Sequence, residues 1–282
     1  MKKLLLVTCC LLFVICYSGC LPKKTGETPT PAAPTAEGSA GETFGLSPAA
    51  VAPTVSSLLP LEGRPYVTLV SRVDGKELTL SISGIVGAKT LEYELTYLAG
   101  EPGNQLQRGV VGSVELEGRT DYTKAILLGS CSKNVCKYDE GVSEGTITLT
   151  LRAPEGTAQK YESAFHLQPG KAGKEGLTSG DGNFRLTSSS LPPAAFYLTL
   201  STVGLFQTPV GKIVGGPYGI FTPASSKIAG KVSLRLTKTA ANPQILVWDK
   251  KSWQELTTGF ETNGDLVSAT TDRLGTFVVV EE

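Results

Sequence analysis

Few residues in this chain could carry out catalytic chemistry. It has one histidine, His166, so a Ser-His-Asp or Cys-His arrangement would have to converge on that residue, and a centre with two histidine ligands is excluded. His166 stands between Phe165 and Leu167, which predicts a partly exposed strand residue. No phosphate-binding glycine loop occurs in the sequence. We therefore expect no catalytic residue, no metal and no cofactor.

Paired carboxylates remain to be considered, because glycosidases need only two at the right separation. Adjacent Asp139 and Glu140 would point apart in an extended chain, while Glu92 and Glu94 alternate with apolar residues and so belong to a solvent face. The oxygen-rich segment 179–183 lacks the further carboxylate of a calcium loop and predicts a turn. These patterns favour solvated charges, and we expect a chain that is not an enzyme.

The six cysteines fall into two groups. Four lie within the first 20 residues, leaving Cys131 and Cys136 in the body of the chain. Two remaining thiols in an exported protein are most simply a disulfide, here closing a short loop. Free thiols and a metal site are the alternatives, although zinc would need two further ligands.

The N-terminus predicts export. Lys2 and Lys3 precede a mostly apolar run from Leu4 to Cys16, about 20 Å long as a helix and too short for a hydrocarbon core of about 30 Å. The following Ser18-Gly19-Cys20 resembles the bacterial lipobox, with Tyr17 in place of the usual leucine. The resemblance implies a signal peptide at 1–19, acylation of Cys20, and attachment to membrane lipid on the extracytoplasmic side, in the cell envelope or at the cell surface. The alternative is an ordinary cleaved signal with an incidental cysteine.

The segment after the predicted lipidation site has a biased composition. Residues 20–63 are rich in Pro, Thr, Ala and Gly, which predicts a disordered stalk.

The charge of the chain argues against a nucleic-acid partner. Without Lys2 and Lys3, 24 of the 26 basic residues remain against 26 acidic ones, a formal charge of −2. These charges are scattered singly, whereas nucleic-acid binding needs a concentrated basic face. We expect no nucleic-acid partner.

Alternation of apolar and polar residues dominates the rest of the chain and predicts an all-β fold with two tandem antiparallel β-sandwich domains. The first domain, 64–169, contains seven predicted strands, and the pair around Asp74-Gly75 forms a hairpin. Its strand count and spacing resemble immunoglobulin-like domains. The predicted strands lie at 66–73, 76–83, 90–98, 106–116, 122–128, 145–153 and 160–167.

A Gly/Lys-rich segment, 170–176, is predicted to be a linker to a second domain at 177–282. Asn263-Gly264 is the strongest turn signal of this second domain. Its predicted strands lie at 183–187, 195–202, 219–222, 230–237, 244–249, 252–257, 265–271 and 275–280.

The second domain resembles the ZU-type β-sandwich module of bacterial surface proteins and some eukaryotic receptors and adaptors. The resemblance is carried by its turns and aromatic residues: Leu191-Pro192-Pro193, Gly216-Pro217-Tyr218, Thr222-Pro223, the Trp248 and Trp253 strands, and the closing Gly275-Thr276-Phe277. It implies a structural or interaction module and no catalytic signature.

Trp253 and Tyr218 are the candidate ligand-contact aromatics, with Trp248 expected in the core. An exposed indole on a β-sandwich can stack on a sugar ring, but the sequence favours core or domain-interface packing for the tryptophans. The sequence favours a non-catalytic, membrane-anchored lipoprotein with a structural or adhesive role toward a protein or glycan partner. The alternatives are carbohydrate binding through exposed aromatics and an accessory subunit of an envelope complex.

Overall fold

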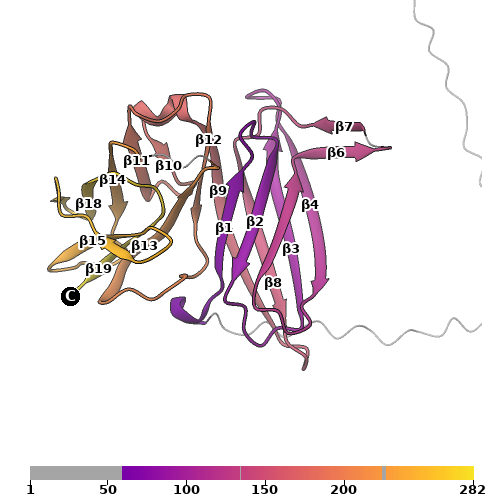
Figure 1. Cartoon of the computed structure of the whole chain (residues 1–282), viewed down its shortest axis with the longest axis horizontal. Coiled ribbons are helices and arrows are strands. Elements are labelled where there is room, and N and C mark those ends of the chain that lie inside the picture. The colour runs from indigo at the N-terminus through magenta and orange to yellow at the C-terminus, as the bar shows by residue number, and fades with distance from the viewer. Residues whose placement is uncertain (1–58, 134, 224–226) are drawn as a thin grey trace, which may run out of the picture. The chain divides into compact units, whose positions relative to one another are not determined.

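The computed structural model describes residues 59–133, 135–223 and 227–282, and this part of the chain consists of β-strands joined by turns (Figure 1). Within these ranges the helical elements are two short 3-10 segments, η1 (Leu61–Gly63) and η2 (Gly170–Lys174). No helix of the described ranges is long and apolar enough to span a membrane. The predicted all-β fold is confirmed. The predicted signal peptide, Cys20 and the stalk up to residue 58 lie outside the described residues.

The first half of the described chain contains the seven predicted strands and one further hairpin, β6–β7. Gly75 has a φ of +70° in the turn between the first two strands, the left-handed conformation that an Asp-Gly hairpin requires. The strands are β1 (Tyr66–Ser71), β2 (Glu77–Ser83), β3 (Thr90–Ala99), β4 (Leu106–Glu115), β5 (Tyr122–Leu127), β6 (Gly129–Ser132), β7 (Val135–Tyr138), β8 (Glu144–Arg152) and β9 (Ala158–Pro169).

The second half contains the eight predicted strands and two that sequence patterning missed. β10 and β17 have two and three residues, too few to show a period. β13 begins at Lys212 rather than Gly219, because the ladder continues through register shifts around Gly215-Gly216-Pro217. The strands are β10 (Leu177–Thr178), β11 (Phe184–Ser188), β12 (Phe196–Ser201), β13 (Lys212–Phe221), β14 (Gly230–Arg235), β15 (Pro243–Trp248), β16 (Trp253–Glu255), β17 (Glu261–Asn263), β18 (Leu266–Thr271) and β19 (Thr276–Glu281).

All strand pairings are antiparallel within the described residues, and they form one long sheet and two covering sheets. The long sheet has nine strands in the order β16-β15-β19-β13-β12-β9-β8-β3-β4. A three-stranded sheet, β1-β2-β5, covers one end, and a five-stranded sheet, β10-β11-β14-β18-β17, covers the other. β6 and β7 pair only with each other.

The first core lies between the three-stranded sheet and the β3, β8, β9 and β12 region of the long sheet. The predicted alternation along β3 is confirmed: Leu91, Tyr93, Leu95 and Tyr97 are buried, while Glu94 is exposed. The three-stranded sheet contributes the opposing apolar residues Val67, Leu69, Leu78, Leu80, Ile82 and Ile126.

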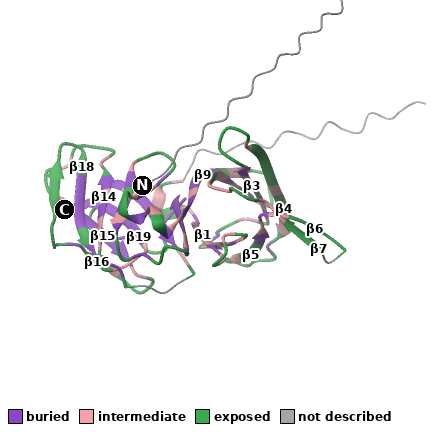
Figure 2. Cartoon of the chain, turned by 90° about the horizontal axis from the view of Figure 1, so that it is seen from above, coloured by how far each residue is buried: buried purple, intermediate pink, exposed green. Residues whose placement is uncertain are grey.

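The second core lies between the five-stranded sheet and β12, β13, β15 and β19. Phe184 and Phe277 have no exposed surface, and their rings are 5.5 Å apart. The reverse face of β15 and β19 carries a smaller cluster of Leu205, Leu246, Val278 and Val280. Both faces of these strands are therefore buried, as Figure 2 shows for β15 and β19.

The two halves share the long sheet. The sequence had instead predicted a linker at 170–176 between two domains. β12 pairs with β9 from Phe196–Pro169 to Leu200–Phe165, so the ladder runs from one half into the other. Leu198 and Leu200 enter the first core, while Tyr197 enters the second. Segment 170–174 is η2, in which Gly170 is buried and would place a Cβ 2.1 Å from the Pro192 carbonyl oxygen. Pairing of β12 satisfies the backbone groups that β9 would otherwise expose.

Candidate functional site

An aromatic cavity of about 560 Å³ lies where β1, the loop after β12 and the turn after β15 meet. Tyr66, Phe206 and Trp248 line it, with apolar surface from Phe221 and Leu274. These residues come from segments far apart in the sequence, and the shared sheet brings the segments together. Ligand pockets are typically concave and lined mostly by apolar side chains with a few polar groups. This cavity is therefore a candidate binding site.

The aromatic residues of the cavity form a continuous chain of ring contacts. Tyr66 meets Phe206 edge to face at 5.8 Å between ring centroids, and Phe206 stacks on Trp248 at 5.4 Å. Trp248 is 4% exposed, whereas Phe206 is 57% exposed. Trp248 is a core residue, as predicted, and it supports a phenyl ring that presents apolar surface to solvent.

Trp253, the first candidate ligand-contact residue, belongs to the same chain but is only half-buried. Its ring lies 5.6 Å from Trp248, and its indole N–H donates to the Gln207 carbonyl oxygen at 2.8 Å. It also packs against the cluster on the reverse face of β15 and β19. This indole therefore holds the loop that carries Phe206, and its N–H is already used.

Tyr218, the second candidate, is not placed to contact a ligand with its ring. It is 7% exposed, stacks on Phe184 at 5.8 Å, and donates its hydroxyl to Asp181 at 2.6 Å. Burial and the neighbouring carboxylate raise the pKa of Tyr218. Burial opposes ionisation of Asp181, but hydrogen bonds from Ser179, Tyr218 and Asn183 outweigh it and lower the pKa of Asp181. The expectation of an exposed Tyr218 is wrong, because β13 turns this face toward the second core.

The 179–183 segment forms the predicted turn. Its carboxylate, Asp181, accepts hydrogen bonds from the Asn183 backbone and from the Ser179 hydroxyl. It therefore supports a turn and anchors Tyr218.

Three of the polar residues that line the cavity, Tyr66, Asp249 and Arg273, are each bonded to a neighbouring group. The Tyr66 hydroxyl and the Thr276 hydroxyl are 2.8 Å apart, and burial raises the pKa of Tyr66 to about 12. Arg273 donates to Asp272 at 2.6 Å and lies 3.5 Å from Asp249. The backbone hydrogen bond from Ser252 lowers the pKa of Asp249, and the Arg273 hydrogen bond lowers the pKa of Asp272. Both carboxyls are therefore ionised near neutral pH.

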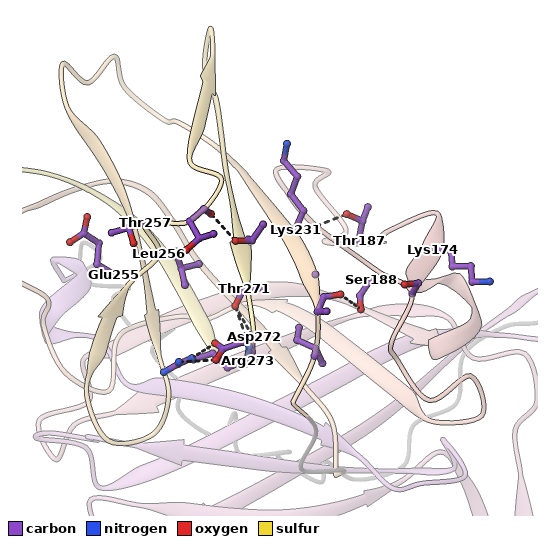
Figure 3. A pocket seen from close by; sticks show the side chains of 16 residues that line it. Lys174, Thr187, Ser188, Lys231, Glu255, Leu256, Thr257, Thr271, Asp272 and Arg273 are labelled. Atoms are coloured by element: carbon purple, nitrogen blue, oxygen red, sulfur yellow. Dashed lines mark hydrogen bonds and ion pairs between the residues drawn. The ribbon is translucent and has the colours of Figure 1, made fainter.

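A second, polar groove of about 880 Å³ lies along one end of the five-stranded sheet (Figure 3). Its hydroxyl groups are largely engaged with the protein itself. Ser188 donates to the Ala229 carbonyl oxygen at 2.8 Å, Thr270 to that of Thr258 at 2.7 Å, and Thr271 to that of Arg273 at 2.9 Å. These bonds hold the turns together and leave the groove less suited to a ligand than the aromatic cavity.

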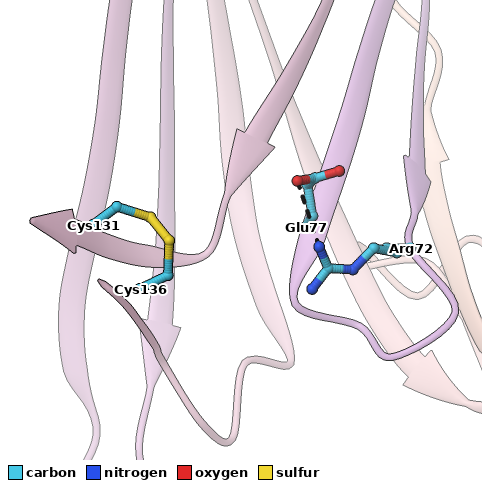
Figure 4. Close-up of a disulfide and its surroundings, with 4 residues drawn as sticks. All are labelled: Arg72, Glu77, Cys131 and Cys136. Atoms are coloured by element: carbon cyan, nitrogen blue, oxygen red, sulfur yellow. Dashed lines mark ion pairs between the residues drawn. A yellow bond between two sulfur atoms is a disulfide. The ribbon is translucent and has the colours of Figure 1, made fainter. Parts of the chain in front are cut away.

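The predicted disulfide is present. Cys131 on β6 and Cys136 on β7 are directly paired, with their sulfur atoms 2.02 Å apart (Figure 4). Both residues are exposed. The base of the hairpin is fixed by stacking of Arg72 and Lys76 on the Tyr138 ring, at 5.4 and 5.0 Å from its centroid.

The remaining sequence candidates are structural. His166 is half-buried, with its Nδ1 atom 3.2 Å from the Thr178 carbonyl oxygen. Glu92 lies on the outer face and accepts two hydrogen bonds from Arg152, at 2.7 and 2.9 Å. Asp139 accepts from Tyr97 at 2.8 Å and from Arg108 at 3.2 Å. Sequence patterning missed the link made by Asp139, because it joins residues 42 and 31 positions away.

Two residues of the cavity were also missed from the sequence, Tyr66 and Phe206. Tyr66 is the first residue of a predicted strand, and nothing in the sequence indicates its hydrogen bond to Thr276, 210 residues later. Phe206 follows Gly204-Leu205 in a loop between predicted strands, where an aromatic residue has no periodic neighbours. A phenylalanine in such a loop is itself a weak signal for a surface site.

Known proteins supply no further assignment. No protein-family model matches the chain, and no curated protein matches it. No group of three or more His, Cys, Asp or Glu side chains in the described ranges could hold a metal ion. Cys20, the predicted lipidation site, lies outside these ranges.

Proposed function

We propose that this chain is a non-catalytic binding lipoprotein, held by acylated Cys20 on the extracytoplasmic side of a membrane. The anchor rests on the signal-like N-terminus and the Ser18-Gly19-Cys20 sequence. The Cys131–Cys136 disulfide supports an oxidising compartment, since such bonds are rare in the cytosol.

The aromatic cavity is the observation that carries a binding role. It combines an exposed Phe206 ring with two ionised lining residues that are already paired with each other, Asp249 and Arg273. A carboxyl whose pKa is lowered is a poor general acid at neutral pH, because it holds no proton to give. The site thus favours recognition of a ligand over proton transfer.

The anchor is tested by Cys20→Ser in the full chain. We expect the unchanged protein to fractionate with membranes and to carry acyl chains by mass spectrometry of its N-terminal peptide, and the variant to be found in the soluble fraction. One acyl chain holds a protein only marginally, whereas two hold it stably. An unmodified N-terminus beginning at Met1 would contradict the proposal.

Carbohydrate binding is the second candidate, and the exposed Phe206 ring beside Trp248 favours it. Flat apolar faces stack on pyranose rings, and the cavity rim can accept or donate hydrogen bonds to hydroxyls. Titration of cell-wall and capsular glycans should change tryptophan fluorescence through Trp248 and Trp253. Phe206→Ala should weaken binding at least about tenfold, as loss of a central aromatic contact does. A panel without any response would oppose this candidate.

A further inference from the structure

The long sheet ends on one side in an unusually long outer strand, β4. All ten of its residues pair with β3, from Thr90–Glu115 to Ala99–Leu106, without a register shift. In the described strand order β3 is its one neighbour. The other outer strands of the three larger sheets have two, three, three, six and six residues. A strand of this length exposes about 33 Å of backbone N–H and C=O groups along its free edge.

The side chains of β4 do little to protect this edge. Proteins normally guard outer strands with lysine, proline, a bulge or an inward-pointing charge, because open edges pair with other chains. β4 contains no lysine or proline, and its one arginine, Arg108, is paired with Asp139 at 3.2 Å. Val111, near its centre, is 74% exposed between Gly109 and Gly112. Figure 2 shows the strand as largely exposed.

The disulfide-closed hairpin β6–β7 overhangs this edge. Figures 1 and 2 both show the hairpin projecting outward beyond β4. Asp139, directly after β7, ties the hairpin to Tyr97 of β3 and Arg108 of β4. A strand added to β4 would therefore lie beside the hairpin at the Leu106 end of β4.

The charges along the edge are arranged in a self-complementary way. The hairpin, 129–138, carries Lys133 and Lys137 and no acidic residue, whereas the other end of β4 carries Glu115, followed by Glu117, both exposed. Arg119 near that end is held by the carbonyl oxygens of Glu115 and Leu116. Antiparallel pairing of two copies places the acidic end of each beside the basic hairpin of the other, while parallel pairing would bring like charges together.

We propose that β4 is a homodimerisation edge, on which a second copy of this chain adds its own β4 in antiparallel register. The two-fold axis passes near Val111, so that this valine faces its counterpart and the sheet continues through both copies. Such an interface is isologous and closed, so it stops at the dimer. About ten backbone hydrogen bonds would form between the two strands. The hairpin of each copy clamps the acidic end of its partner.

Cysteine crosslinking tests the register directly. Val111→Cys in the full chain should give a disulfide-linked dimer under mild oxidation, because the two thiols meet at the axis. The matched control is Val210→Cys, whose side chain is 90% exposed and lies before β13, far from the edge along the sheet. The proposal would be overturned if the disulfide-linked dimer formed no faster with the thiol at position 111 than with the thiol at position 210. It would also be overturned if the thiol at position 111 crosslinked to a different protein instead of a second copy.

Charge substitutions test the interface without a covalent link. Val111→Lys puts like charges opposite each other and should raise the dimer dissociation constant about tenfold, measured by sedimentation velocity, while Val210→Lys leaves it unchanged. Lys133→Glu with Lys137→Glu should also weaken the dimer, and adding Glu115→Lys with Glu117→Lys should restore it. The proposal is contradicted if the unchanged protein is monomeric at all accessible concentrations. It is also contradicted if the charge exchange fails to restore a dimer that the substitutions of Lys133 and Lys137 weakened.

Discussion

The two outer strands of the nine-stranded sheet, β16 and β4, differ in length and in how they are packed. At one end the outer strand β16 has three residues, and its Trp253 packs on Trp248 and holds the loop that carries Phe206. At the other end β4 presents ten residues with an exposed Val111 at their centre. The comparison indicates that one end is closed by aromatic packing and carries the cavity, whereas the other is left open for a strand from outside.

The largest expected effect is a difference in stability between substitutions at the β16 end and at the β4 end of the nine-stranded sheet. Trp248→Ala should lower the free energy of unfolding by about 3–5 kcal/mol, because it leaves a hole beneath Phe206 and beside Trp253. Val111→Ala should change that of the monomer by less than about 0.5 kcal/mol, since the side chain is exposed in a single copy. Guanidinium unfolding monitored by circular dichroism measures both, and equal losses would remove the contrast.

The disulfide should matter more to the hairpin than to the whole domain. Cys131→Ser with Cys136→Ser opens a loop with a sequence separation of five, and the loss of closure entropy is about 2 kcal/mol at most. We expect faster amide hydrogen exchange at 129–138 and little change in the second core. Unchanged exchange in the hairpin would show that Arg72, Lys76 and Asp139 suffice to hold it.

A smaller effect tests how the cavity end is joined across the chain. Tyr66→Phe removes the hydrogen bond between β1 and Thr276 of β19 and should cost about 1 kcal/mol of unfolding free energy. Thr276→Val provides the matched change on the other side. In a double-mutant cycle the two should couple by about 1 kcal/mol, and additive losses would mean that the bond adds nothing.

The smallest expected effect is a titration beside the hairpin. Hydrogen bonding to Arg72 lowers the pKa of Asp74 from 3.8 to about 2. A lowered folded-state pKa means that the stabilising contribution is present above pH 4 and is lost as the pH falls toward 2. Carbon-13 NMR of the carboxyl should therefore show a midpoint near pH 2, and Arg72→Gln should move it up toward the ordinary value. A midpoint near 4 in the unchanged protein would be the contrary result.

Sequence periodicity predicted much of the fold because many strands have one buried face and one exposed face. The alternation of Leu91, Tyr93, Leu95 and Tyr97 is such a case, and so is the Asp74-Gly75 hairpin, whose glycine alone satisfies the turn geometry. The candidate site was harder to predict, because exposure of a single aromatic depends on which face its strand presents. Tyr218 proved buried, and Phe206, which had no periodic neighbours, proved exposed.

By itself the sequence determined the all-β class, the approximate positions of most strands and the pairing of the two cysteines in the body of the chain, since these follow from local spacing and from the few available partners. The tertiary structure alone decided that β9 and β12 join the two halves into one sheet, that Tyr66 and Phe206 meet beside Trp248, and that β4 is left as a free edge. These features depend on which strands become neighbours, and neighbour choice is set by the burial of two cores at once rather than by any local pattern.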